Sequence, residues 1–160
     1  MIKIRHIGDH IYEATNNKEV IIINPKKYNP IEYFVTGLAN CSAYDIVEMA
    51  KKKGYELNNF VMEIEYKRKD TFPKIFTEFH FIYRLDSNAD NITAKRWVLS
   101  SLETYSSTVN TVRNTSKINY SIYLNDEVIA FKESIISGDG ATYNQEIEEE
   151  DDGFCGCCGV

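Results

Sequence analysis

The pattern of hydrophobic and polar residues predicts strands at the start of the chain. Residues 2–14 contain a short alternating segment around Gly8-Asp9. Residues 20–23 then form a β-branched run that ends at Asn24-Pro25. Because β-branched runs bounded by turn residues are typical of strands, we expect two strands of a hairpin or meander here.

The same alternation returns further along the chain. Residues 60–66 and 76–85 alternate, and the polar, proline-containing segment 68–74 between them predicts a hairpin loop. Residues 118–124 predict a last strand, and a short further strand is expected near 128–131. In the segment 76–85, two alternating sets should face opposite sides of the sheet: Phe76, Glu78, His80 and Ile82 on one side, and Thr77, Phe79, Phe81 and Tyr83 on the other.

Two long amphipathic helices are predicted between these strands. The first begins with Asn29 as N-cap, Pro30 at the first helical position and Glu32 closing a capping box, and it ends at the Lys-Lys-Lys-Gly segment 51–54. Apolar residues recur at helical spacing within it, and again over residues 93–113 in the second helix.

Cys41 lies in the middle of the first predicted helix, on its apolar side. The residues around it are small, namely Gly37, Ala39, Ser42 and Ala43. Small residues on a buried helix let another backbone approach closely, so the centre of this helix is suited to a tight contact.

The order of elements, ββαββαβ, predicts the α+β fold class with two long helices covering an antiparallel sheet. The length of 160 residues fits one domain and a tail. We place the domain at residues 1–143. Residues 144–160 form an acidic, cysteine-rich segment that we expect to be a flexible tail.

Charge is concentrated in this tail. The formal net charge is −6, and six acids with no base lie between residues 146 and 152, so residues 1–143 are formally neutral. A neutral domain without a basic stripe argues against nucleic-acid binding. The chain has no apolar run of about 18 residues and no signal-peptide pattern, so we expect a cytoplasmic protein that does not bind membranes.

The four cysteines fall into two groups. Cys155, Cys157 and Cys158 lie within four residues near the end of the chain and cannot build a disulfide framework. They could chelate a soft metal ion or supply a resolving thiol. Cys41 is either a buried apolar residue or a reactive thiol. The histidines imply no metal site within residues 1–143, and nothing in the sequence calls for a cofactor.

Three separated motifs resemble the OsmC and organic-hydroperoxide-resistance superfamily, with the short YhfA-like branch as the best match. Residues 29–47 resemble the family helix "SPxELLLAALGGCTAxDV". Arg68 and residues 72–80 resemble the hairpin "R…HPPVFTKIH", and residues 102–109 resemble "SEEKYCSVSATL". The resemblance covers roughly residues 18–124 in the same order.

The resemblance implies an intertwined homodimer that reduces hydroperoxides through a pair of cysteines, a peroxiredoxin-like activity. Cys41 matches the peroxide-attacking cysteine, whereas Ser106 stands at the position of the second cysteine. Arg68 matches a family arginine that could lower the pKa of the thiol, although an arginine in a basic loop is also commonly only solvated. His80 matches a strand histidine that is more commonly structural.

Glu32 aligns with the glutamate that opens the family helix. It precedes Cys41 by nine residues, about 13 Å along a helix axis, so it could approach a thiol only across a dimer. It could equally serve only as a helix cap. Two functions therefore stay open. The first is a hydroperoxide reductase that uses Cys41. The second is a non-catalytic module, which binds either a small thiol or lipoyl-type ligand or a metal ion through the tail cysteines.

Overall fold

The computed structural model describes residues 1–136 of the chain. Within them the backbone divides into two compact units, Met1–Gly37 and the residues from Leu38 on. The tail cysteines and the acidic run lie outside the described residues. None of the helices formed by residues 1–136 is long and apolar enough to cross a membrane.

The first unit contains an antiparallel sheet of three strands, β1 (Lys3–Gly8), β2 (Ile11–Thr15) and β3 (Val20–Ile23), in that order. We expected two strands in this region, and the structure has three, so that prediction was wrong. Gly8-Asp9, around which the alternation was noted, is the turn between β1 and β2. The backbone there has positive φ at Gly8 (119°), Asp9 (48°) and His10 (61°). This conformation favours glycine and tolerates aspartate and histidine.

Helix α1 (Pro30–Lys52) starts as predicted. The side-chain oxygen of Asn29 accepts hydrogen bonds from the amides of Ile31 (2.9 Å) and Glu32 (3.1 Å), and the Glu32 carboxylate accepts one from the Asn29 amide (2.6 Å). This reciprocal arrangement is a capping box. The helix ends at the lysine cluster, where Gly54 takes a positive φ of 74°.

The second unit contains a sheet of four strands in the order β4 (Leu57–Arg68), β5 (Phe76–Ser87), β6 (Lys117–Leu124) and β7 (Glu127–Ser134). The predicted strands are all present. The prediction of an antiparallel sheet was wrong at one place, because β5 and β6 run parallel. The helical segment between them carries the chain back along the sheet before β6 begins. The sheet therefore contains one β-helix-β crossover between two antiparallel pairs.

The second long helix is divided into three pieces. It consists of α2 (Asn91–Ser100), the π-helical turn η1 (Ser101–Tyr105) and α3 (Ser107–Val112). The break lies at Ser106, whose backbone is extended (ψ 101°) and whose side chain accepts from the Val109 amide as the N-cap of α3. Serine competes well for such caps, and helical periodicity alone does not reveal this break.

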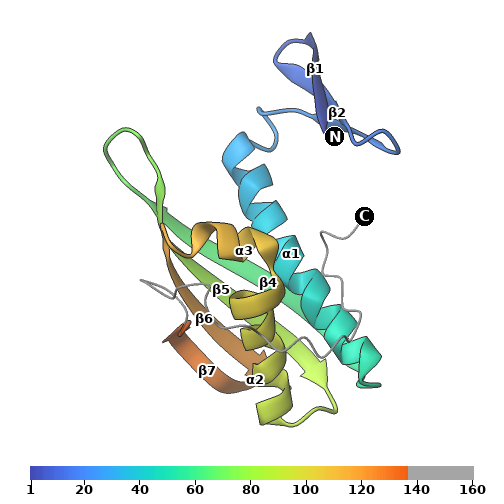
Figure 1. Ribbon diagram of the computed structural model, residues 1–160, viewed down its shortest axis with the longest axis vertical. Coiled ribbons are helices and arrows are strands. Elements are labelled where there is room, and N and C mark those ends of the chain that lie inside the picture. The colour runs from blue at the N-terminus through green and yellow to red at the C-terminus, as the bar shows by residue number, and fades with distance from the viewer. Residues whose placement is uncertain (137–160) are drawn as a thin grey trace, which may run out of the picture. The chain divides into compact units, whose positions relative to one another are not determined.

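The core of the second unit lies between the helices and one face of the four-stranded sheet. Figure 1 shows α2 and α3 across one face of this sheet. Phe79, Phe81 and Tyr83 of β5 are all 0% exposed, as the predicted alternation requires. Leu38 and Ile46 of α1 are buried to the same degree, at 1% and 0%. On the opposite face of β5, the side chains of Glu78, His80 and Arg84 form hydrogen bonds and ion pairs with polar residues of β4 and β6.

Candidate functional site

Cys41 lies on the buried face of α1, as predicted. Its side chain is 3% exposed, and the residues one turn away on the same face, Leu38 and Asp45, are buried too. In the single chain the sulfur is therefore shielded from water. Burial by itself does not separate the two open interpretations of Cys41, an apolar core residue and a reactive thiol.

The buried face of α1 next to Cys41 is unexpectedly polar. The hydroxyls of Ser42 and Tyr83 share a hydrogen bond of 2.8 Å. The Ser101 hydroxyl lies 2.9 Å from the Ser42 hydroxyl and 3.2 Å from Oδ2 of Asp45. Ser42, Asp45, Tyr83 and Ser101 thus form a chain of side chains at 0% exposure, and we call this set the buried polar cluster.

Burial sets the electrostatics of this cluster. Loss of solvent raises the pKa of Asp45 to about 6, although the hydrogen bond from Ser101 works against that rise. Burial also raises the pKa of Tyr83 well above its ordinary value. Asp45, Tyr83 and Ser101 were not among the candidate site residues predicted from the sequence. The available signal was the presence of Ser42 and Asp45 within an otherwise apolar stripe of the helix.

Ser106, which the sequence resemblance aligns with the second cysteine of the family, is 0% exposed. Its segment lies against α1 on either side of Cys41. The Ser101 hydroxyl contacts the Ser42 carbonyl at 3.3 Å, and the Thr108 hydroxyl contacts the Leu38 carbonyl at 3.5 Å. The structure therefore brings the chain segment that holds Ser106 beside the helical turn that holds Cys41.

The structure gives Arg68 and Glu32 other contacts. Arg68 is exposed at the end of β4, where its Nε donates to the Lys74 carbonyl at 2.7 Å and its guanidinium lies 5.7 Å from the Phe76 ring. These contacts stay within its own hairpin, so within the described single chain Arg68 is not brought to Cys41. Glu32 is engaged in the capping box of α1.

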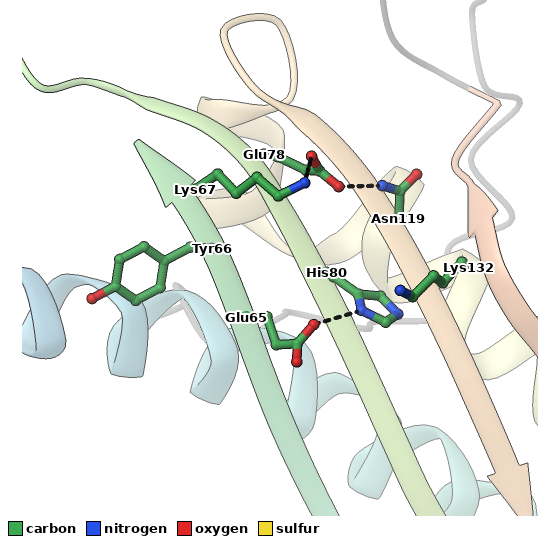
Figure 2. A pocket seen from close by; sticks show the side chains of 7 residues that line it. All are labelled: Glu65, Tyr66, Lys67, Glu78, His80, Asn119 and Lys132. Atoms are coloured by element: carbon green, nitrogen blue, oxygen red, sulfur yellow. Dashed lines mark hydrogen bonds and ion pairs between the residues drawn. The ribbon is translucent and has the colours of Figure 1, made fainter. Parts of the chain in front are cut away.

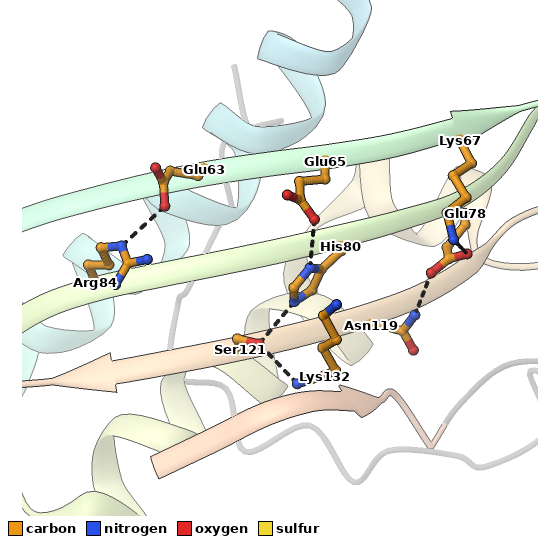
Figure 3. A network of polar contacts seen from close by, with 9 residues as sticks. All are labelled: Glu63, Glu65, Lys67, Glu78, His80, Arg84, Asn119, Ser121 and Lys132. Atoms are coloured by element: carbon orange, nitrogen blue, oxygen red, sulfur yellow. Dashed lines mark hydrogen bonds and ion pairs between the residues drawn. The ribbon is translucent and has the colours of Figure 1, made fainter. Parts of the chain in front are cut away.

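His80 is the centre of a separate network on the polar face of the sheet (Figure 3). Its Nδ1 lies 3.2 Å from the Glu65 carboxylate and its Nε2 lies 2.9 Å from the Ser121 hydroxyl. The spacing resembles an acid-histidine-serine relay. However, Ser121 is 1% exposed and already accepts a hydrogen bond from the Lys132 amide at 2.9 Å. Ser121 is thus unsuited to attack a substrate. The contacts of His80 fit the structural role that is common for a histidine in such a strand.

A pocket of about 170 Å³ with a mostly polar lining lies beside His80, and Figure 2 shows the side chains that line it. Its formal charges are balanced, because the lining carboxylates of Glu65 and Glu78 are matched by the ammonium groups of Lys67 and Lys132, and Lys67 pairs with Glu78 at 2.8 Å. Among residues 1–136 no group of three histidine, cysteine, aspartate or glutamate side chains is placed to hold a metal ion. The pocket therefore gives no sign of selecting a charged ligand.

Comparison with known proteins gives the family. The model of the OsmC-like protein family matches residues 23–121, which include Cys41, Arg68 and Ser106. The chain therefore belongs to the OsmC-like protein family. No curated protein matches the chain.

Solved structures agree on the fold. A hypothetical protein from Aquifex aeolicus VF5 is 21% identical with a TM-score of 0.69, over 78% of this chain and 96% of that one. An OsmC-like protein from Mycoplasma pneumoniae is 19% identical with a TM-score of 0.67, over 78% and 95%. An organic hydroperoxide resistance protein OsmC from Legionella pneumophila, described as a predicted redox protein, is 18% identical with a TM-score of 0.55, over 76% and 96%. The chain therefore shares its fold with these OsmC-like proteins, among them the Legionella pneumophila protein described as an organic hydroperoxide resistance protein.

Proposed function

We propose that the protein is a hydroperoxide reductase that uses Cys41 as its peroxide-attacking thiol. The observation that carries the proposal is the placement of Cys41. It lies at the centre of α1, beside the buried polar cluster, and next to the segment that holds Ser106, within the stretch matched by the family model. The match of the three sequence motifs to the short YhfA-like branch supports the same assignment.

The proposed chemistry begins with the Cys41 thiolate. Its sulfur attacks one oxygen of the hydroperoxide, so an S–O bond forms while the O–O bond breaks. The departing alkoxide takes a proton and leaves as the alcohol, and Cys41 is left as a sulfenic acid. A dithiol then reduces the sulfenic acid, which restores the thiol and releases water and a disulfide.

Ser106 determines how this cycle can close. A hydroxyl cannot form the disulfide that a second cysteine at this position would form with Cys41. Ser106 instead caps α3, which gives it a structural role. We therefore propose that an external dithiol, or one of the tail residues Cys155, Cys157 and Cys158, resolves the sulfenic acid.

The active form in this proposal is a homodimer. Val20, Ile21 and Ile22 of β3 are 57%, 55% and 57% exposed in the single chain, and Tyr44 and Val47 of α1 are 46% and 41% exposed. Apolar surface of this kind is favourable to bury against a second copy. In such a dimer, Glu32 and Arg68 of one subunit would serve the Cys41 site of the other.

Consumption of cumene hydroperoxide in the presence of a small dithiol tests the function. The full chain should consume the peroxide catalytically, and Cys41→Ser should reduce the rate to that of the dithiol alone. A chain with Cys155, Cys157 and Cys158 all replaced by serine is the control for thiol content. It should keep its activity when the dithiol is abundant. Activity that survives in Cys41→Ser would refute the proposal.

A second candidate function follows from the buried serine at position 106. If the loss of the second cysteine marks lost peroxidase chemistry, the protein is a module that binds a small thiol or lipoyl-type ligand. In that case Cys41 should stay inert toward peroxide while the protein still retains such a ligand. Equilibrium dialysis with lipoamide, compared between the full chain and Cys41→Ser, separates this function from the first.

A further inference from the structure

Asp45 has an unusual environment for a carboxylate. Its side chain is 0% exposed, and its Oδ2 has one hydrogen-bond donor, the Ser101 hydroxyl at 3.2 Å. Its Oδ1 is buried with no hydrogen-bond partner among the described residues. Buried carboxylates normally have their oxygens satisfied, because leaving one without a donor costs free energy. Packing alone therefore does not account for a carboxylate at this position.

Asp45 lies close to Cys41 by helical geometry. It follows Cys41 by four residues on α1, so the two residues share the buried face one turn apart. Side chains on a helix lean toward its N-terminus, which directs the Asp45 carboxylate back over the turn of Cys41. Residues with this spacing have their Cβ atoms about 5–6 Å apart.

The groups around Asp45 do not neutralise it. The sheet presents the hydroxyl of Tyr83 from β5, which is linked to Asp45 through Ser42 and Ser101. The helical segment presents Ser101, and α1 itself presents Ser42 and Cys41. Among residues 1–136 no lysine, arginine or histidine forms an ion pair with Asp45. Within the described single chain, the negative charge of Asp45 therefore lies beside the helical turn of Cys41 without a paired cation.

We propose that Asp45 is a positioning residue that restrains the reactivity of Cys41, because its carboxylate disfavours the thiolate in a buried, low-dielectric site. A like charge nearby raises the pKa of a thiol. The proposal deepens the proposed function, since it concerns the thiol assigned there as the peroxide-attacking group. The raised pKa of Asp45, about 6, means that the restraint is present at neutral pH and relaxes as the pH falls through that value.

The test measures the ionisation of Cys41 directly and needs no peroxide. The ultraviolet absorbance of the thiolate is followed against pH for the full chain, and the same titration of Cys41→Ser is subtracted to remove the tail cysteines and the tyrosines. The comparison is then repeated in the Asp45→Asn background. Unit charges about 6 Å apart at an effective dielectric constant of roughly 20 predict that the midpoint of Cys41 falls by about 1 to 2 pH units in Asp45→Asn.

Two further variants separate charge from shape. Glu48→Gln removes the same charge from α1 seven residues away from Cys41 and should leave the midpoint within about 0.3 pH unit. Asp45→Glu keeps the charge and should stay close to the wild-type midpoint. Should Asp45→Asn fail to fold, Asp45→Ser removes the charge with a smaller side chain and is measured in the same way.

A midpoint that is unchanged or higher without the Asp45 charge overturns the inference, even if the protein consumes peroxide. A lowered midpoint supports it, even if the protein consumes none. The inference and the proposed function therefore fail separately.

Discussion

The hydroxyl of Ser42 on α1 and the phenol of Tyr83 on β5 lie 2.8 Å apart, and both side chains are 0% exposed. This hydrogen bond ties the helix that carries Cys41 to the centre of the sheet. Tyr83→Phe should lower the free energy of unfolding by about 1–2 kcal/mol, because the Ser42 hydroxyl loses a buried partner. The loss should be closer to about 1 kcal/mol than to 2 kcal/mol, because the Ser42 hydroxyl keeps its contact with Ser101.

Urea denaturation measures this change, and Tyr123→Phe is the matched control. Tyr123 is only partly buried on the other face of the sheet, where its ring lies 4.1 Å from the Arg84 guanidinium. Its substitution should change the free energy of unfolding by less than about 0.5 kcal/mol. Equal effects of the two substitutions would show that the Ser42–Tyr83 bond does not anchor α1.

Asp45 should make the stability of the protein depend on pH in a definite direction. Its pKa is raised from 3.8 to about 6 in the folded state, so the folded chain binds the proton more tightly than the unfolded chain. This contribution to stability is present below about pH 4 and is lost as the pH rises through 6. Asp45→Asn has no such contribution to lose. As the pH rises from 4 to 7, the free energy of unfolding of the variant should therefore increase by up to about 3 kcal/mol relative to that of the wild type.

Urea denaturation at several pH values between these limits tests the prediction. The comparison with the wild type cancels the contributions of carboxylates whose pKa is lowered, such as Glu78 and Glu133. Glu48→Gln, a carboxylate-to-amide change on the same helix, is measured alongside as the control for the substitution itself. A constant difference for Asp45→Asn would mean that Asp45 titrates at its ordinary pKa in the folded protein.

Local sequence signals predicted much of the fold. The capping box of Asn29 and Glu32 placed the start of α1, and the alternation through Phe79, Phe81 and Tyr83 identified the buried face of β5. These features depend on neighbouring residues only. The parallel pairing of β5 with β6 depends on the path of the chain over some thirty intervening residues, which alternation does not report.

The break at Ser106 and the buried polar cluster were missed for a related reason. Helical periodicity continues across residues 93–113, and only the competition of the Ser106 side chain for a cap ends the helix there. Ser42, Tyr83 and Ser101 come from three separate segments, so their hydrogen bonds exist only in the folded chain. Cys41, by contrast, could be singled out because its position within one helix is a local property.

Ser106→Cys should allow a disulfide with Cys41 under mild peroxide. The contacts of Ser101 with Ser42 and of Thr108 with Leu38 hold the two segments side by side, which favours the short Cα separation that a disulfide needs. Peptide mapping under non-reducing conditions detects the bond. Ser107→Cys is the control, since Ser107 is exposed and should not pair with Cys41. If Ser106→Cys forms no such bond, Ser106 does not occupy the position of the second cysteine.

Ala39 offers a test of the proposed dimer. It lies among the small residues around Cys41 and is partly buried in the single chain. Ala39→Trp should convert the dimer to a monomer in sedimentation velocity at micromolar concentration, with little change in secondary structure by circular dichroism. Lys53→Trp, just beyond the end of α1, should leave the dimer intact. A wild-type chain that sediments as a monomer would contradict the shared site.

The central claim is that Cys41 reacts with hydroperoxides, and trapping its oxidised form tests this most directly. The full chain is treated with one equivalent of cumene hydroperoxide and then with dimedone, which labels sulfenic acids, and the labelled peptides are identified by mass spectrometry. We predict a label on the peptide that contains Cys41, and its loss when a dithiol is added before dimedone. A Cys41 peptide that stays unmodified while the peroxide is consumed elsewhere would contradict the account.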